Sequence, residues 1–144
     1  MAENEDIKVD NTTEAPEKPI VKKKKAKRVV AIGVVHVKSN FNNTIISISD
    51  EKGNVIASSS SGACGFRGSK KGTAYASQVA TEKAGQIAKN TYGLSSVKVY
   101  LSGIGLGRDA AVRSIANLNI EVTDIIDVTG IPHGGVRPKK ARRV

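Results

Sequence analysis

Residues 29–59, which read VVAIGVVHVKSNFNNTIISISDEKGNVIASS, decide the fold class because they indicate three consecutive β-strands. Residues 29–37 are rich in β-branched side chains, and isoleucine alternates with serine through residues 43–49 at the period of two that is typical of a strand. Residues 50–54 form a turn sequence, and a third strand is expected over residues 55–59. Because the connections are short, we expect an antiparallel meander.

Helical patterns alternate with two further strands in the second half of the chain. Apolar residues recur at helical spacing over residues 73–89, and Gly93 is a typical helix stop. A fourth strand is expected at residues 97–101, a short second helix after the N-cap Asp109, and a fifth strand over residues 120–128. The apolar stripe of the first helix comprises Ala76, Val79, Ala80 and Ile87, and one face of the fifth strand carries Ile120, Val122, Ile126 and Val128. The order βββαβαβ predicts an α/β (α+β) fold with a mixed five-stranded sheet and two helices.

Charged termini flank this single domain, which we place at residues 29–128. Residues 1–20 contain six acidic and two basic residues and show no hydrophobic period, so we expect a disordered acidic tail. Residues 21–28 form a basic arm, and residues 129–144 form an extended basic C-terminal tail. The prolines of this tail disfavour a helix, so we expect it to become ordered only on a surface.

The net charge of the 144-residue chain is +10, from 23 basic and 13 acidic residues, and the basic residues are clustered. Such clustering favours a polyanion partner, most commonly nucleic acid, over a merely soluble basic protein. Aromatic residues make up only 3% and tryptophan is absent, which argues against a deep aromatic pocket for a small-molecule substrate. Cys64 is the only cysteine, so neither an intramolecular disulfide nor a cysteine-based zinc site is expected. The sequence shows no membrane span or signal peptide, and we expect a cytoplasmic protein without cofactor or metal.

The two basic termini are the first candidate RNA-binding elements. An extended cationic segment can thread between phosphates and release counterions; the alternative is a solvated linker or a solubilising tail. The candidate residues are Lys22, Lys23, Lys24, Lys25, Lys27 and Arg28 in the arm and Arg137, Lys139, Lys140, Arg142 and Arg143 in the tail.

Two glycine-rich segments are further candidates. In residues 65–71, GFRGSKK, glycines let backbone N–H groups approach phosphates just before a helix N-terminus. Phe66 either stacks on a base or plugs the loop against the core. In residues 103–108, GIGLGR, the spacing departs from the dinucleotide-binding motif GxGxxG, and an RNA-phosphate site completed by Arg108 and Arg113 fits as well.

The residue pattern argues against an enzyme. The domain has seven acidic residues, and their positions do not indicate the convergent carboxylates that a two-metal nuclease requires. His36 lies in an apolar strand and is interpreted as a satisfied core or sheet-face residue, and no third group is identifiable to orient a Cys64–His pair. The competing hypotheses are a metal-dependent nuclease and a free nucleic-acid-binding module with similar affinity for DNA and RNA.

Five motifs occur in a fixed order between about residue 27 and residue 144. They are Ser39-Asn40-Phe41-Asn42-Asn43-Thr44-Ile45, residues 65–71, residues 103–108, Asp127-Val128-Thr129-x-Ile131-Pro132-His133 and Arg137-Pro138-Lys139-Lys140-x-Arg142-Arg143. In this combination the chain resembles the universal eleventh protein of the small ribosomal subunit, bacterial type. The resemblance implies a ribonuclease H-like fold without its catalytic acids. It also implies a place in the ribosome, bound to small-subunit (16S) rRNA on the platform, beside the cleft for the Shine–Dalgarno helix of the mRNA. The implied neighbours are the sixth, seventh and eighteenth small-subunit proteins.

The resemblance also implies which residues contact RNA. Besides the terminal cations, these are Phe41, Asn42, Asn43, Arg67, Ser69, Lys70, Lys71, Arg108 and His133. Three features depart from the family pattern: Ile104 and Leu106 stand where prolines are common, Gly134 replaces an asparagine, and the acidic tail has no recognised counterpart. We hypothesise that this tail screens the basic arm before assembly. Unchanged solubility and rRNA affinity after its deletion would count against that hypothesis.

Overall fold

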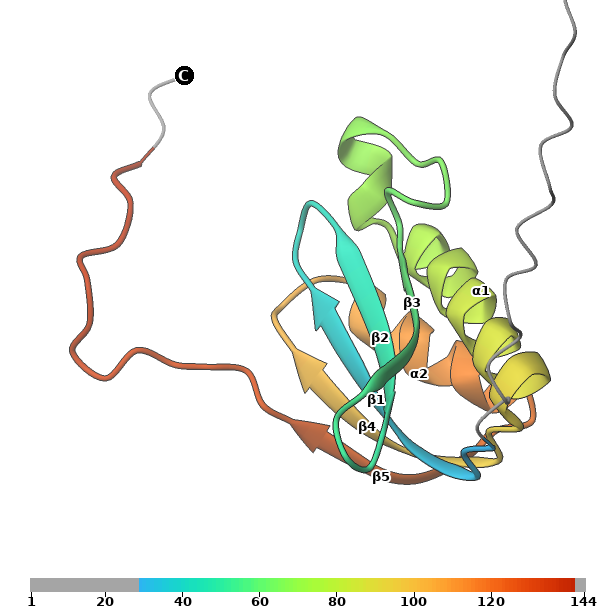
Figure 1. The fold of residues 1–144 in the computed structure, drawn as a ribbon. Helices are drawn as coiled ribbons and strands as arrows, with labels where there is room; N and C mark the ends of the chain where they lie inside the picture. Colours follow the sequence, from blue (N-terminus) through green and yellow to red (C-terminus); the bar gives the residue numbers. More distant parts are fainter. Residues whose placement is uncertain (1–28, 142–144) are drawn as a thin grey trace, which may run out of the picture.

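The computed structural model describes residues 29–141 (Figure 1). The acidic tail, the basic arm at residues 21–28, and Arg142 and Arg143 lie outside the described residues. The elements in chain order are β1 (Ile32–Ser39), β2 (Thr44–Asp50), β3 (Val55–Ser60), the short 3-10 helix η1 (Gly68–Gly72), α1 (Ala74–Tyr92), β4 (Ser96–Ser102), α2 (Gly107–Asn117) and β5 (Glu121–Asp127). Apart from η1, this is the predicted order βββαβαβ.

The five strands form one mixed sheet in the order β3-β2-β1-β4-β5. β1 pairs antiparallel with β2, and β2 pairs antiparallel with β3, so the predicted meander is confirmed. β1 also pairs parallel with β4, and β4 pairs parallel with β5. Parallel neighbours need long crossover connections, and these run through α1 and α2. The arrangement agrees with the ribonuclease H-like fold that the family resemblance implies.

Both helices lie on the same face of the sheet (Figure 1). α1 packs over β2 and β3, α2 packs over β1, β4 and β5, and the two helices contact each other. α1 can approach closely because its buried residues are small; these are Ala76, Ser77, Ala80, Thr81, Ala84, Gly85 and Ala88. A Cβ at Gly85 would lie 2.4 Å from Leu118 Cδ1, so any side chain there would require Leu118 to move.

The predicted apolar stripe of α1 is correct at Ala76 and Ala80, but Val79 is only half-buried and Ile87 is 42% exposed. Small residues such as Gly85 occupy the buried positions instead, because the helix packs tightly between the sheet and α2. A search for larger apolar side chains at helical spacing therefore misplaces part of this face. The helix also runs three residues beyond Lys89 and ends at Gly93, whose φ of 71° suits a glycine C-cap.

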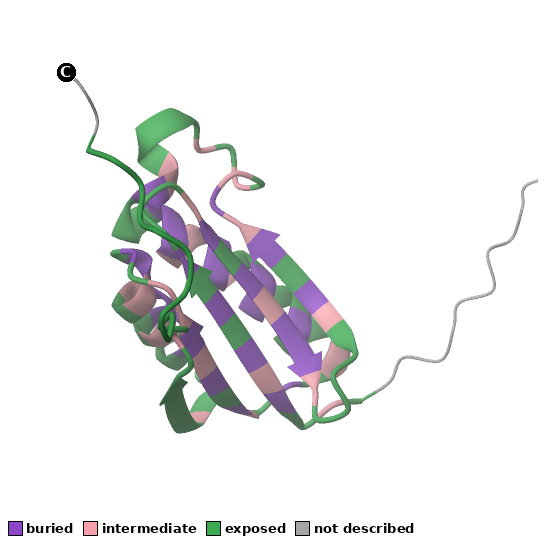
Figure 2. Cartoon of the chain, turned by 90° about the vertical axis from the view of Figure 1, so that its left-hand side faces the viewer, coloured by how far each residue is buried: buried purple, intermediate pink, exposed green. Residues whose placement is uncertain are grey.

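The core lies between the sheet and the helices. Val35 of β1 stands opposite Ile48 of β2 and Val99 of β4, and each of the three is at most 1% exposed. Buried residues alternate with less buried ones along most of β1 to β4 (Figure 2), and β2 follows the predicted alternation as far as Ile48. Ser49, which was expected on the opposite face from Ile48, is buried as well. Each fully buried valine or isoleucine contributes about 1.5–3 kcal/mol of hydrophobic stabilisation, so this layer holds the sheet to the helices.

A bulge in β5 changes which side chains face the core. Val122 is opposite Val97, but Asp124 is opposite Lys98, so Thr123 is an extra residue in the strand. The faces are exchanged beyond this point, because side chains alternate along a strand. Ile126, which is 39% exposed, therefore lies on the opposite face from Val122. The predicted single face through Ile120, Val122, Ile126 and Val128 is wrong for this reason.

The face of the sheet away from the helices carries polar and aromatic side chains. The rings of His36 and Tyr100 stack with centroids 5.4 Å apart, and Lys98 pairs with Asp124 at 3.4 Å. His36 is thus a sheet-face residue, one of the two positions expected for it. Across residues 29–141, no helix is long and apolar enough to cross a membrane.

Candidate nucleic-acid interface

Three loops and the start of the C-terminal tail meet at one edge of the sheet (Figure 1). β1, β4 and β5 are parallel, so their C-terminal ends lie at the same edge, where β2 begins and β3 ends. The three loops are residues 40–43, residues 61–73 and residues 103–106. We call this edge the loop end of the sheet, and the opposite edge, which carries the β2–β3 turn, the turn end.

The β1–β2 loop presents an aromatic ring and an amide to solvent. Phe41 is 67% exposed, Asn42 is exposed, and the loop is closed by a 2.9 Å hydrogen bond from the Asn40 N–H to the Asn43 carbonyl. Asn43 differs because it is half-buried, and its Oδ1 is buried without a hydrogen-bond partner in the described structure. Phe41 and Asn42 are therefore available to a partner on the surface, whereas the Asn43 side chain points partly into the protein.

Residues 61–73, the cationic loop, bring the predicted phosphate-binding side chains to the loop end. Arg67, Ser69 and Lys70 are exposed and Lys71 is half-buried. Among residues 29–141, no ion pair involves these three cations. The loop leads directly into α1, whose N-terminus carries a partial positive charge that favours anions.

Gly72 fixes the cationic loop against the β1–β2 loop. A Cβ at this position would lie 1.9 Å from the Phe41 carbonyl oxygen, a separation that no side chain allows. The close approach holds the β1–β2 loop, with its exposed Phe41, against the end of η1. Thr73 then starts α1 by accepting a 3.3 Å hydrogen bond from the Ala76 N–H.

Phe66 packs against a second aromatic ring. It is half-buried, and its ring meets the Tyr75 ring edge-on, with centroids 5.9 Å apart and an interplanar angle of 88°. Phe66 lies outside the buried hydrophobic core, so it is not a core plug in the sense considered above. Tyr75 is 65% exposed and was missed by the sequence analysis. Its position directly after the cationic loop, in a chain with three tyrosines, is the sequence signal that could have identified it.

Arg113 lies in a groove between α1 and α2. The groove has a volume of about 310 Å³ and is lined by Ala74, Tyr75, Gln78, Ala110, Arg113, Ser114 and Asn117. Arg113 is exposed and forms no ion pair with any of residues 29–141. The groove therefore adds a cation and an exposed tyrosine ring next to the start of α1.

The glycine-rich turn at residues 103–107 packs directly on the β1–β2 loop. Gly103 has φ +96°, and a Cβ there would lie 2.2 Å from the Ser39 carbonyl oxygen. A Cβ at Gly105 would lie 2.5 Å from the Asn40 carbonyl oxygen, and one at Gly107 would lie 2.5 Å from Thr44 Oγ1. Close packing thus accounts for all three glycines without a bound phosphate.

Arg108, which the family resemblance implies as an RNA contact, has two partners within the protein. Its Nη1 donates a 2.8 Å hydrogen bond to the Gly103 carbonyl, and its Nη2 forms an ion pair with Asp127 Oδ2. Hydrogen bonds from the Thr129 hydroxyl and the Thr129 N–H, together with the Arg108 guanidinium, lower the pKa of Asp127 to about 2. The Arg108 guanidinium is therefore paired with an Asp127 carboxylate that remains ionised throughout the neutral pH range.

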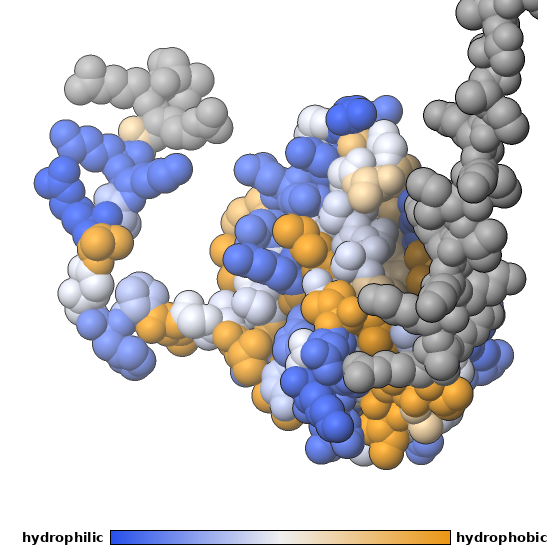
Figure 3. Space-filling view, in the orientation of Figure 1, coloured by the Kyte–Doolittle hydropathy of each residue, from blue (hydrophilic) through white to orange (hydrophobic). Residues whose placement is uncertain are grey.

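The C-terminal tail leaves β5 at the loop end, and hydrophilic side chains gather on its outer part (Figure 3). His133, Arg137, Lys139 and Lys140 are exposed, and residues 129–141 contain no helix or strand, as an extended tail requires. Within the described part of the chain, the hydrogen bonds that join the tail to the domain all involve Thr129.

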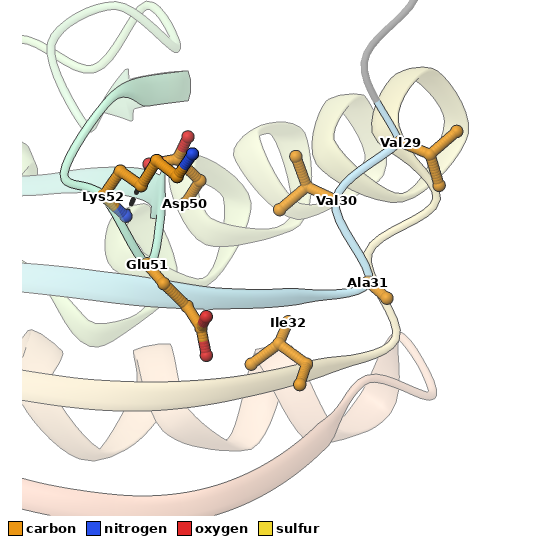
Figure 4. Close-up of a pocket in the computed structure, with 7 residues that line it drawn as sticks. All are labelled: Val29, Val30, Ala31, Ile32, Asp50, Glu51 and Lys52. Atoms are coloured by element: carbon orange, nitrogen blue, oxygen red, sulfur yellow. Dashed lines mark hydrogen bonds between the residues drawn. The ribbon is translucent and has the colours of Figure 1, made fainter.

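The turn end holds a hollow of a different character (Figure 4). It has a volume of about 500 Å³ and is lined by Val29, Val30, Ala31, Ile32, Asp50, Glu51 and Lys52. Asp50 Oδ1 accepts a 3.0 Å hydrogen bond from the Lys52 N–H, which shapes the turn rather than facing a ligand. This hollow is mixed in charge and lacks the cation cluster of the loop end. No group of three or more metal-ligating side chains occurs among residues 29–141.

Comparison with known proteins identifies the family. The model of the family "Ribosomal protein S11" matches residues 33–143. Small ribosomal subunit protein uS11 of Stenotrophomonas maltophilia (strain K279a) is 55% identical over 128 residues, which cover 88% of this chain and 98% of that protein. Small ribosomal subunit protein uS11 of Xanthomonas oryzae pv. oryzae (strain PXO99A) is 54% identical over 129 residues, with 88% and 98% covered. The chain therefore belongs to the ribosomal protein S11 family of the small ribosomal subunit.

Proposed function

We propose that this small-subunit ribosomal protein binds 16S rRNA through the loop end of its sheet and through its basic termini. The observation that carries the proposal is the convergence of exposed cations on one edge of the fold. Arg67 and Lys70 are exposed in the cationic loop there beside the half-buried Lys71, and the C-terminal tail starts at the same edge. Because the chain belongs to a ribosomal protein family, rRNA is the polyanion that such a surface fits.

The contacts divide by chemistry. Arginine and lysine side chains of the cationic loop and the tail bind phosphates, and the N-terminus of α1 adds its free backbone donors. Phe41 stacks on an unpaired base, because its ring is exposed on the same surface. Lys22, Lys23, Lys24, Lys25, Lys27, Arg28, Arg142 and Arg143 extend the phosphate contacts from outside the described residues. Ser69, Asn42, Asn43 and His133 complete the proposed set.

Specificity for one rRNA site comes from shape. Phosphate contacts position a protein on RNA but carry no sequence information. Three loops that the fold holds in place, with a tail that starts at the same sheet edge, can match only an RNA surface with the corresponding arrangement of phosphates. We therefore propose a defined site on the subunit platform, next to the cleft for the Shine–Dalgarno helix of the mRNA. The proposed neighbours are the sixth, seventh and eighteenth small-subunit proteins, within cytoplasmic ribosomes.

The competing nuclease hypothesis finds little support in the placement of the carboxylates. Asp124 pairs with Lys98, Asp127 pairs with Arg108, and Asp50 accepts backbone hydrogen bonds within its own turn. Carboxylates that converge on two metal ions would be needed for that chemistry. We propose a non-catalytic role, and the absence of Mg²⁺-dependent RNA cleavage by the purified protein is the expected result of a direct assay.

The proposal is tested by binding across a salt series. The ligands are a platform fragment of 16S rRNA, an unrelated RNA of equal length and a DNA duplex. We expect tighter binding to the platform fragment and a steep fall of affinity with salt, because counterions are released from the phosphates. Lys70→Gln should lower the salt slope by about one, whereas Lys52→Gln at the turn end should leave it unchanged. Equal affinity for all three ligands would reduce the protein to a general polyanion binder.

A further inference from the structure

We propose that Arg108, Asp127 and Thr129 act together as positioning residues that aim the C-terminal tail at the RNA, and that none of them contacts RNA itself. This inference deepens the proposed function and rests on it. It assigns Arg108 a role different from the direct RNA contact implied by the family resemblance. We call the three residues, together with the Gly103 backbone, the clasp.

The clasp is a closed ring of hydrogen bonds that joins three segments of the chain. Arg108 Nη1 donates to the Gly103 carbonyl at 2.8 Å, and Arg108 Nη2 pairs with Asp127 Oδ2. Asp127 Oδ1 accepts from the Thr129 hydroxyl at 2.6 Å and from the Thr129 N–H at 2.9 Å. The Gly103 N–H then donates to Thr129 Oγ1 at 3.1 Å, which closes the ring. The start of α2, the end of β5 and the glycine-rich turn are thus held in one geometry.

Each residue of the ring has hydrogen-bond donors or acceptors that its neighbours satisfy. The Thr129 hydroxyl donates its one hydrogen to Asp127 and accepts from Gly103, so the ring uses both functions of this oxygen. The fork of the arginine spans a carbonyl and a carboxylate at once, which the single ammonium of a lysine does not match. Gly103 joins the ring with a φ of +96°, which favours glycine, and the absence of a Cβ lets it pack on Ser39.

The ring is the only hydrogen-bonded anchor of the tail within residues 29–141. After Thr129, every residue from Gly130 to Ala141 is exposed, and the predicted phosphate ligands begin at Arg137. A small backbone rotation at Thr129, where the tail starts, moves the cations from Arg137 onward by a large distance. Holding Thr129 in place reduces the number of directions that the free tail samples. It therefore reduces the conformational entropy that the tail loses when it binds RNA.

The ion pair also removes Arg108 from the set of free cations. Its side chain is 26% exposed and its charge is balanced by Asp127, whereas the cations of the cationic loop have no such partner in the described structure. A phosphate that took the two N–H groups now used by the ring would have to displace the Gly103 carbonyl and a carboxylate that is bound to two donors of Thr129. The ring therefore occupies two of the five N–H donors of Arg108, and Asp127 balances its charge.

A mutant cycle against the tail charges separates positioning from contact. Thr129→Val keeps the shape of the side chain and removes the hydroxyl, and Thr129→Ser keeps the hydroxyl as the matched control. Each is made in the full chain with its native tail and in a full chain whose tail cations (Arg137, Lys139, Lys140, Arg142 and Arg143) are replaced by glutamine. Affinity for the platform rRNA fragment is measured across salt, and thermal unfolding checks that each variant is folded.

With the native tail, we expect Thr129→Val and Arg108→Ala to weaken binding by about threefold to tenfold, the scale of ordering one or two side chains. The salt slope should stay constant, because no phosphate contact is lost, and Thr129→Ser should bind like the parent. With the neutral tail, neither Thr129→Val nor Arg108→Ala should change the affinity. The proposal is overturned if Arg108→Ala lowers the salt slope by about one and still weakens binding with the neutral tail.

A measurement without RNA decides the positioning claim separately. Backbone ¹⁵N relaxation of the free protein should show that Thr129→Val increases the fast mobility of Gly130 and Ile131, while Thr129→Ser leaves it unchanged. Equal mobility in the parent and in Thr129→Val would overturn the clasp. If instead the parent shows no preference for the platform fragment, the proposed function fails, and the relaxation data still decide whether the clasp holds the tail.

Discussion

The cationic loop and the glycine-rich turn at residues 103–107 contain the same residue types but use them in opposite ways. Both combine several glycines with an adjacent arginine, and both lie at the loop end of the sheet before a helix. In the cationic loop, Arg67 and Lys70 are exposed. After the turn, Arg108 is bound to Asp127 and to the Gly103 carbonyl.

The difference teaches how little a glycine–arginine pattern says until the surroundings are known. The three glycines of the turn are required because oxygen atoms of Ser39, Asn40 and Thr44 lie where their side chains would be. In the cationic loop, Gly62, Gly65 and Gly68 have no such obstruction, and only Gly72, at the end of η1, packs against the β1–β2 loop. One segment is therefore a packing element with an internal arginine, and the other is an open surface with free cations.

The largest expected effect is on stability and falls on the turn. Gly103→Ala should lower the free energy of unfolding by about 2–4 kcal/mol, because the new Cβ meets the Ser39 carbonyl and the positive φ is strained. Urea unfolding measures this. Gly62→Ala in the cationic loop is the matched control, because its Cβ would have only an ordinary 3.7 Å contact with Lys71 Cδ. An equal loss in both variants would remove the distinction between the two segments.

The second effect is on RNA affinity and falls on the cationic loop. Replacing Arg67, Lys70 and Lys71 together by glutamine should weaken binding to the platform fragment at least about tenfold and lower the salt slope by about two to three. Stability should change little, because no ion pair of these side chains occurs in residues 29–141. Arg108→Gln should leave the slope unchanged. If the salt slope falls equally in the triple variant and in Arg108→Gln, Arg108 contacts phosphate as the cations of the loop do, and the proposed difference between the two segments is wrong.

A third, smaller effect concerns the exposed ring beside the cationic loop. Phe41→Ala should weaken binding by about 1–2 kcal/mol without changing the salt slope, because stacking on a base involves no counterion release. Val55→Ala at the turn end is the control, since Val55 is a similarly exposed apolar residue at 63%. An unchanged affinity in Phe41→Ala would show that the ring does not stack on RNA.

The smallest effect is a pH dependence that arises from the turn and its clasp. The pKa of Asp127 is lowered to about 2 in the folded protein, so its interactions contribute stability above the ordinary aspartate pKa of 3.8. That contribution is lost as the pH falls from about 4 toward 2. Thermal unfolding between pH 2 and pH 6 should therefore show a steeper acid loss in the parent than in Asp127→Asn. Coincident curves would mean that the carboxylate contributes nothing to stability.

Local sequence patterns were sufficient for most of the fold. The alternation of isoleucine and serine identified β2, and the turn sequence after Asp50 identified the meander, because both signals lie within a few adjacent residues. The bulge at Thr123 left no such signal, since it depends on how β5 is paired with β4. The same holds for Ile87, whose exposure depends on how the small residues of α1 meet α2.

The candidate site divides in the same way. The cations of residues 67–71 were identifiable because their exposure follows from a polar, glycine-rich loop. The partner of Arg108 was not, because Asp127 is 19 residues away and reaches it only through the parallel pairing of β4 and β5. Tyr75 was missed because a single tyrosine near a helix start has no pattern of its own. Its contact with Phe66 appears only in three dimensions.

The central claim is that RNA binds the loop end of the sheet, and chemical-shift mapping with the platform rRNA fragment tests it most directly. We expect backbone amide shifts at Phe41 and Asn42, at residues 65–72, at Tyr75 and along the tail. We expect none at Lys52 in the turn end or at His36 and Tyr100 on the face of the sheet away from the helices. Shifts centred on His36 and Tyr100, with the cationic loop unmoved, would contradict it.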